Sequence, residues 1–265
     1  MKKIIALVLA CMLIVTCFAG CGAADDGKLV MATNAAFPPY EYKADDGSFA
    51  GIDVEIAALI AEELGLELEI VDIDFGAIVA GVATGKYDMG MAGLTVTEER
   101  KESVNFTNSY AKGIQSVIVK ADSAYASFED FYTGFDADGN PAGVKDNIKI
   151  GVQQDTTGDI YSSSDAVDWG FGEANVVRYK TGADAVEALK SGKVTAVIID
   201  NEPAKSFVNA NEGLKILEGS YAEEDYAIAI NKEDTKLLED INAALKKLTD
   251  EGKIAQIVNK YIPAE

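Results

Sequence analysis

Apolar and polar positions alternate along this chain in two distinct periods, beginning at Lys28. Short apolar runs and two-residue alternation predict strands at residues 29–33, 66–73, 87–92, 148–152, 176–179, 194–199 and 226–230. Apolar residues at helical spacing predict helices at residues 53–64, 74–85, 157–164, 182–189 and 234–262, with Pro203 early in a further helix and a break near Gly252. This alternation predicts an α/β fold whose largely parallel sheets are covered by helices on both faces.

Three polar residues stand where helices are expected to begin. Asp53, Asp74 and Thr157 each precede or open an amphipathic stretch, which is the preferred place for an N-cap. We therefore assign Asp53 and Asp74 to helix starts and not to chemistry. For Thr157, capping a helix and binding a ligand are compatible roles.

The strand and helix pattern occurs as two sets, followed by a long helical tail. Extended segments at residues 110–120 and 221–231 lie at the two changeovers between the sets. If both run between lobes, the chain crosses twice and its C-terminus returns to the first lobe. The expected division places lobe 1 at residues 28–112 and 225–265, with lobe 2 inserted at residues 113–224.

The first residues have the pattern of a leader. Lys2 and Lys3 precede an apolar run at residues 4–15, which is short for spanning a bilayer. The order Ala-Gly-Cys ending at Cys21 resembles a bacterial lipobox, although Phe18 replaces the usual leucine. We expect a lipoprotein signal peptide at residues 1–20, acylation of Cys21 with palmitate, and a tether at residues 21–27. Cleavage to an unanchored secreted protein is the alternative.

Composition removes several classes of function. The chain has no histidine, and its three cysteines all lie in the leader, so triad chemistry is excluded and a zinc site is not expected. With 23 basic and 44 acidic residues the net charge is −21, which disfavours nucleic acid and anionic lipid as partners. We expect no cofactor and no catalytic residue.

One loop carries a partial cation motif. Asp136, Asp138 and Asn140 imitate the opening of a calcium loop within the long segment at residues 122–147. Pro141 stands where that motif requires glycine, and Asn147 stands where it requires a bidentate glutamate. A surface hairpin is the expected structure.

The stretch at residues 91–106 reads as a strand end, a Gly/Thr turn and a short helix carrying Arg100 in its first turn. A guanidinium fork binds a carboxylate bidentately, and amides at a helix start favour the same anion. The stretch therefore predicts an anion site. An exposed arginine in a charged turn is the alternative.

Five motifs in order resemble the amino-acid-binding proteins of polar amino-acid ABC importers, the bacterial extracellular solute-binding family. They are Phe37-Pro-Pro-Tyr-Glu-Tyr42, Gly51-Ile-Asp-Val-Glu55, Ala92-Gly-Leu-Thr-Val-Thr-Glu-Glu-Arg100, Gly151-Val-Gln-Gln-Asp-Thr-Thr157 and Ala196-Val-Ile-Ile-Asp200. The resemblance covers residues 28–263. It implies a periplasmic-binding-protein (type II) clamshell, in which two α/β lobes are joined by two hinge strands.

The resemblance also implies roles for individual residues. The ligand's α-carboxylate falls to Arg100 with the amides of Thr95 and Thr157, and its α-ammonium falls to Asp200, the Gly93 carbonyl and the Thr95 hydroxyl. Arg100 and Asp200 each follow a strand or turn end, where open α/β sheets bind ligands. The expected ligand-binding set is Asn34, Phe37, Phe75, Gly93, Leu94, Thr95, Arg100, Gln153, Thr156, Thr157 and Asp200.

Simpler interpretations remain for three of these residues. Asp200 is also placed to cap a helix beginning at Asn201. Phe37 and Phe75 match the positions that flank a ligand side chain, and both also suit the core. Asn34 and Gln153 are neutral at positions that read the side chain's far end, so the hypothesis is a polar, neutral L-amino acid.

The implied mechanism is capture by hinge closure, followed by delivery to a membrane permease. On this interpretation the protein is an extracytoplasmic monomer, held at the outer face of the membrane by lipid on Cys21. Two rivals remain. One is a dehydratase-like enzyme that uses a cleft carboxylate, although no cleft acid beyond Asp200 stands out; the other is a sensor module that signals through a partner.

Overall fold

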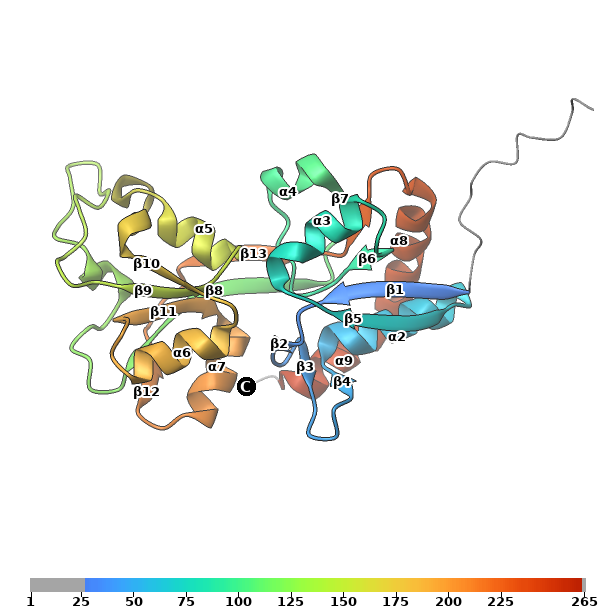
Figure 1. Cartoon of the computed structure of the whole chain (residues 1–265), viewed down its shortest axis with the longest axis horizontal. Helices are drawn as coiled ribbons and strands as arrows, with labels where there is room; N and C mark the ends of the chain where they lie inside the picture. Colours follow the sequence, from blue (N-terminus) through green and yellow to red (C-terminus); the bar gives the residue numbers. More distant parts are fainter. Residues whose placement is uncertain (1–26, 264–265) are drawn as a thin grey trace, which may run out of the picture.

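The computed structural model describes residues 27–263, which fold as two α/β units side by side along the long axis (Figure 1). The predicted signal peptide, Cys21 and most of the predicted tether lie outside the described residues. Within residues 27–263, no helix combines the length and the apolar content that crossing a membrane requires.

The first unit is built on a five-stranded sheet. Its strand order is β5-β1-β6-β14-β7, with β5 and β6 parallel to β1 and with β14 antiparallel to both of its neighbours. The strands are β1 (Lys28–Thr33), β5 (Glu67–Asp72), β6 (Met89–Gly90), β7 (Val104–Phe106) and β14 (Ala229–Asn231). Its helices are α2 (Ile52–Leu64), α3 (Ile78–Ala83), α4 (Glu98–Ser103), α8 (Thr235–Asp250) and α9 (Lys253–Tyr261).

The second unit is built on a six-stranded sheet. Its main order is β10-β9-β11-β8-β12, and β13 also pairs with β8. The strands are β8 (Ala111–Lys120), β9 (Ile150–Gln153), β10 (Val176–Tyr179), β11 (Ala196–Asp200), β12 (Leu214–Ile216) and β13 (Ala222–Tyr226). Helices α5 (Thr157–Ser163), α6 (Gly182–Lys190) and α7 (Asn201–Ala210) accompany it. The predicted α/β class and its two sets of elements are confirmed.

The chain passes between the two sheets twice, through adjacent antiparallel strands. β8 leaves the first unit, and β13 returns to it, with Gln115 opposite Ala222 and Ala111 opposite Tyr226 (Figure 1). An isolated bridge between Thr95 and Tyr226 joins this pair to the first unit. The two connecting strands, β8 and β13, therefore lie next to the turn that carries Thr95.

Tertiary packing alters several predicted local features. The predicted strand at residues 87–92 pairs only at β6, and a small antiparallel sheet of β2 (Ala36–Phe37), β3 (Glu41–Lys43) and β4 (Phe49–Ala50) was not predicted. The predicted break in the last helix is confirmed, because Gly252 has a φ of 73° between α8 and α9. A glycine adopts this left-handed conformation without the strain that a Cβ adds.

All three residues lie at helix starts, as expected, but none of their side chains caps a helix. Gly51 is the N-cap of α2, and Asp53 lies inside the helix with a fully buried side chain. Asp74 precedes a 3₁₀ turn (Phe75–Ala77) and forms no capping hydrogen bond. The N-cap of α5 is Thr156, whose hydroxyl accepts from the Asp159 amide, so Thr157 is the first helical residue.

The segment at residues 122–147 forms a hairpin, as expected. Antiparallel bridges join Tyr132 to Val144 and Phe135 to Pro141. One Asp136 oxygen accepts from the amides of Asp138 and Asn140, both at 2.9 Å, so this carboxylate is used in closing the turn.

Candidate functional site

A narrow, mostly enclosed cavity of about 20 Å³ lies between the two units, enough room for a water molecule as the units stand. The residues that line it are Asn34, Phe37, Glu41, Phe75, Ala92, Gly93, Thr95, Arg100, Gln153, Thr156, Thr157 and Asp200. The structure thus brings together ten of the eleven residues expected from the sequence. Leu94 does not line the cavity, because its side chain is fully buried in an apolar cluster around Ile78 and Val104.

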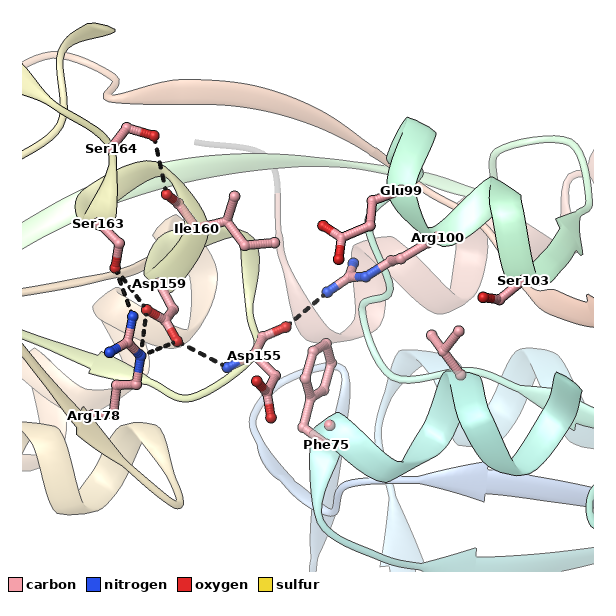
Figure 2. A pocket seen from close by; sticks show the side chains of 12 residues that line it. Phe75, Glu99, Arg100, Ser103, Asp155, Asp159, Ile160, Ser163, Ser164 and Arg178 are labelled. Atoms are coloured by element: carbon pink, nitrogen blue, oxygen red, sulfur yellow. Dashed lines mark hydrogen bonds and ion pairs between the residues drawn. The ribbon is translucent and has the colours of Figure 1, made fainter. Parts of the chain in front are cut away.

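Arg100 enters the cavity from the first turn of α4. The Thr97 hydroxyl caps this helix by accepting from the Arg100 amide at 3.1 Å. The guanidinium donates from Nη1 to the Thr95 carbonyl at 2.8 Å and from Nη2 to the Asp155 carbonyl at 3.1 Å (Figure 2). These bonds use two of its five N–H donors, so the fork retains donors for a ligand.

The side chain of Arg100 is largely buried. The residue is 9% exposed, and its guanidinium lies 5.4 Å from the centroid of the Phe75 ring, a distance suited to a cation–π contact. Burial lowers the pKa of Arg100, and the charge of Glu224 is the strongest opposing influence. Since an arginine stays protonated in proteins, the cavity contains a partly desolvated cation.

Asp200 enters the cavity from the end of β11 in the second unit and is 8% exposed. It occupies the N-cap position of α7 but accepts no capping hydrogen bond, so the capping interpretation is wrong. Its carboxylate instead accepts from the Tyr226 hydroxyl. Burial raises the pKa of Asp200 to about 7, and the neighbouring charge of Glu224 adds to the shift. A buried anion of this kind is suited to a cationic partner.

Thr95 links Arg100 to Glu224, a buried acid behind the cavity. Its carbonyl holds Arg100, and its hydroxyl donates to Oε2 of Glu224 at 3.0 Å. The hydroxyls of Thr95 and Thr157 lie 3.5 Å apart, across the gap between the units. Glu224 also accepts from the Gln115 amide at 3.0 Å, so each crossing strand contributes a side chain to this contact.

The two amides also meet across the cavity. The Gln153 amide donates to Asn34 Oδ1 at 2.8 Å, and the Asn34 amide donates to the Ile73 carbonyl at 2.8 Å. Each amide nitrogen thus has a partner within the protein. Each nitrogen uses one of its two N–H donors in these bonds, and Asn34 Oδ1 already accepts one bond, so the pair retains both donors and acceptors for a ligand.

Phe37 and Phe75 belong to the core and to the cavity wall at once. Phe37 is 8% exposed and stacks on Tyr40 with ring centroids 6.0 Å apart. Phe75 packs beside the first-unit cluster while its ring faces the guanidinium of Arg100. Packing in the core and lining a ligand site are therefore compatible roles for both rings.

The sequence analysis missed three buried acids. Glu41 is 1% exposed, lines the cavity, and its carboxyl lies beside the buried carboxyl of Asp53. Asp53 accepts from the Gly93 amide at 2.8 Å and from the Tyr110 hydroxyl at 2.9 Å. Glu224, the third, stands behind Thr95. The first two acids lie within recognised motifs, but nothing in the local pattern marks them as buried.

An open groove lies outside the cavity and shares Phe75 and Arg100 with it (Figure 2). On its second-unit side, Asp159 accepts from Arg178 at 2.8 and 2.9 Å and from the Asp155 amide at 3.1 Å. These contacts fix the turn whose carbonyl reaches Arg100. The groove is therefore the solvent-facing margin of the closed site.

Comparison with known proteins agrees with this architecture. The family model described as bacterial extracellular solute-binding proteins, family 3, matches residues 29–264. The chain is 30% identical to the arginine-binding extracellular protein ArtP of Bacillus subtilis, over all of both sequences. A mutant of the arginine-binding protein of T. maritima is 36% identical with a TM-score of 0.77, covering 90% of this chain and 96% of that one. An ancestral arginine-binding protein bound to glutamine is 33% identical with a TM-score of 0.78, covering 90% and 99%. This chain belongs to the bacterial extracellular solute-binding proteins of family 3.

Proposed function

We propose that the protein captures an L-α-amino acid between its lobes and delivers it to the permease of an ABC importer. The observation that carries this is the pairing of Arg100 and Asp200, buried in one cavity but contributed by different units. An amino acid is a zwitterion, so its site needs a cation and an anion a short distance apart. A desolvated charge without a partner is costly, which favours a ligand that carries both complements.

The carboxylate end of the ligand is assigned to the Arg100 fork. The free N–H donors of Arg100 face the cavity together with the start of α5, where amides at Thr157 have no partner from a preceding turn. The ammonium end is assigned to Asp200 and the Thr95 hydroxyl oxygen. Both groups line the same cavity, and both accept hydrogen bonds.

Closure follows from where these groups stand. We propose that residues 28–112 with 225–265 form one rigid lobe, that residues 113–224 form the other, and that β8 and β13 bend between them. Contacts between the lobes support a closed state here: Arg100 with the Asp155 carbonyl, Gln153 with Asn34, and Lys180 with Asp74 at 3.6 Å. A bound ligand adds its own contacts to both lobes and so favours closure.

The side chain of the ligand is proposed to be cationic, with L-arginine the expected ligand. The sequence alone favoured a neutral ligand because Asn34 and Gln153 are uncharged, but each amide nitrogen already uses one of its two N–H donors within the protein. Glu41 adds a buried carboxyl, and burial and the charge of Asp53 raise its pKa well above the usual range. A guanidinium supplies the missing cation and satisfies both oxygens. ArtP and the T. maritima protein are named for arginine.

Anchoring and partners extend this proposal outward. A lipid on Cys21 keeps the protein at the outer face of the membrane, and the closed monomer then docks on its permease. A cleavable leader that ends in Ala-Gly-Cys supports the anchor. Incorporation of labelled palmitate, and its loss in Cys21→Ser, tests this step.

We propose that the protein is not an enzyme. Asp200 is the strongest candidate for an acid or base, since burial raises its pKa to about 7. Its carboxylate is already paired with the Tyr226 hydroxyl, and in our assignment it faces an ammonium and not a reacting bond. Incubation with amino acids and hydroxy acids, followed by product detection, decides between these functions.

Isothermal titration with the twenty common L-amino acids tests the proposed function. Binding of one or a few of them at micromolar concentration, with L-arginine preferred, is the expected result. Absence of binding by all twenty overturns the amino-acid assignment. Preference for L-glutamine over L-arginine retains that assignment and overturns the cationic side chain.

A further inference from the structure

Glu224 stands directly behind the cavity without lining it. It lies on β13, opposite Gly113 of β8, and is 5% exposed. Oε2 accepts from the Thr95 hydroxyl and from the Gln115 amide, both at 3.0 Å. The Tyr161 hydroxyl is a third hydrogen-bond partner of this carboxylate. A carboxylate that is buried and held by three polar side chains is costly to desolvate, so it calls for a role beyond packing.

The bond from Thr95 to Glu224 fixes the direction of one hydroxyl. A carboxylate oxygen only accepts, so the Thr95 hydroxyl spends its single proton on Glu224. The lone pairs of that hydroxyl oxygen are then left for other donors. Because Thr95 lines the cavity, its hydroxyl presents an acceptor to whatever the cavity holds. A donor such as an ammonium N–H matches that acceptor, whereas a second acceptor is repelled.

Glu224 also adds negative charge beside Asp200. Its charge is the second cause, after burial, of the raised pKa of Asp200, and it is the strongest influence opposing the lowered pKa of Arg100. The polar groups around it come from every neighbouring element: Gln115 of β8, Thr95 of the turn after β6, Arg100 of α4, Tyr161 and Thr157 of α5, Asp200 of β11 and Tyr226 of β13. Arg100 is the one cation among these, and it is proposed to bind the ligand's carboxylate. On the outer side of Glu224, Lys101 and Lys112 line an open groove, where they pair with Glu98 and Asp225.

We propose that Glu224 is a positioning residue for the α-ammonium of the ligand. It accepts the proton of the Thr95 hydroxyl, so that this hydroxyl acts only as an acceptor toward the cavity, and it supplies a second negative charge near Asp200. Asp200 then faces the ammonium directly, and Glu224 acts on it through the Thr95 hydroxyl, while the Thr95 carbonyl accepts from Arg100. This inference rests on the proposed function, because it presumes a zwitterion in the cavity. It assigns to the return strand β13 a part in recognition as well as in bending.

Glu224→Gln is the direct perturbation, because it keeps the shape and removes the charge. The new amide nitrogen is able to donate to the Thr95 oxygen, which turns the hydroxyl proton toward the cavity and away from its role as acceptor. With L-arginine as the probe at pH 8, we expect binding to weaken by about 10- to 100-fold, the range for a hydrogen bond to a charged group. Glu223→Gln, the neighbouring exposed acid on β13, is the matched control and should stay within about twofold.

The pH profile separates positioning from simple structural support. Wild-type affinity should fall as the pH drops through the apparent pKa of the site, because an ammonium needs an ionised acceptor. In Glu224→Gln the midpoint of that fall should move to lower pH, since one source of the raised Asp200 pKa is gone. Glu41 and Asp53 are present in both proteins, so their titration is common to both curves. Unchanged affinity, or weaker binding with an unchanged midpoint, overturns the proposal.

A second variant keeps the test decisive if Glu224→Gln fails to fold. Thr95→Val removes the hydroxyl with little change in volume, whereas Thr95→Ser retains it. We expect Thr95→Val to lose about tenfold or more for L-arginine and Thr95→Ser to stay within about threefold. Equal losses in both variants overturn the role of the hydroxyl. Wild-type protein that binds none of the twenty amino acids refutes the proposed function itself, whereas wild-type binding with unaffected variants refutes this inference alone. If L-glutamine is the amino acid selected, the same titrations use L-glutamine.

Discussion

Replacing Arg100 with alanine tests the proposed site most directly. The side chain is 9% exposed and holds two backbone carbonyls, one in each lobe, so its loss affects the ligand and the closed state together. Removing one partner of a buried charge pair costs about 3–5 kcal/mol. At about 1.4 kcal/mol per factor of ten, the affinity for L-arginine should fall by roughly 100- to 4,000-fold.

Titration calorimetry at pH 8 measures this loss directly, and thermal unfolding with and without L-arginine measures it independently. A ligand at 100 times its Kd stabilises the wild-type protein by about 2.7 kcal/mol, and the variant should lose most of that gain at the same concentration. Lys101→Ala is the matched control, because Lys101 is an exposed neighbour paired only with the exposed Glu98 at 2.8 Å. Its affinity should stay within about twofold of the wild type.

Arg100→Lys separates charge from shape. Lysine keeps the positive charge but lacks the planar fork, so it should recover part of the affinity and not all of it. A folded Arg100→Ala protein that binds L-arginine within threefold of the wild type would refute the reasoning. The ligand's carboxylate would then lie elsewhere.

Three further predictions concern pH, stability and specificity. Burial and the charge of Glu224 raise the pKa of Asp200 to about 7, whereas the same carboxyl in the unfolded chain loses its proton near pH 4, so ionised Asp200 destabilises the ligand-free fold at pH 8. Asp200→Asn should therefore raise the ligand-free melting temperature at pH 8 while abolishing binding. A lower melting temperature would contradict this. Gly51→Ala should lower the free energy of unfolding by about 2–4 kcal/mol in chemical denaturation, because φ is 126° and the added Cβ would lie 2.2 Å from the Tyr40 carbonyl oxygen. Gly65→Ala, with a φ of 72° and open space around it, should lower it by about 1–2 kcal/mol, and equal losses would show that the contact with Tyr40 is unimportant. Glu41→Gln should weaken L-arginine binding by about 10- to 100-fold and change L-glutamine binding by less than about threefold in calorimetry, and equal effects on both ligands would place Glu41 away from the side chain.

The arrangement of the site explains why one turn dominates these predictions. The turn after β6 presents Gly93 and Thr95 to the cavity, and the Asp53 carboxylate holds the Gly93 amide from behind. Thr95 joins Arg100 on one side to Glu224 on the other. A substitution at any of these residues should therefore alter the hydrogen bonds of the others, so the effects of combined substitutions on affinity should not be additive.

Much of this architecture was readable from local pattern. The period of the apolar residues predicted β1, β5, β9, β10 and β11, because each is a short apolar run or alternates between apolar and polar residues. The break between α8 and α9 was predicted because Gly252 interrupts an otherwise continuous amphipathic stretch. Arg100 was singled out by its place in a short helix after a strand end, and Asp200 by the resemblance to the solute-binding family, with which its place at a strand end agrees.

Other features depend on contacts between distant segments. β14 enters the first sheet antiparallel, between two strands that precede it by more than a hundred residues, and nothing within its three residues indicates that direction. Leu94 lies within the binding turn, but its side chain faces the core and not the cavity. Asp53 has the local signature of a helix start, and only packing against Gly93 and Tyr110 shows its buried role.

The sequence by itself determined the α/β class and the order of the elements, because these follow from period and turn chemistry, and its five motifs implied, by resemblance, the pairing of Arg100 with Asp200. Only the tertiary structure decided which carboxyl groups are buried around that pair. Glu41 and Glu224 belong to small or edge elements whose burial is set by strands far away in the chain. Removing a carboxylate from water raises its free energy and its pKa strongly, so the electrostatics of the site depend on the packing of the two lobes and not on the residue types alone.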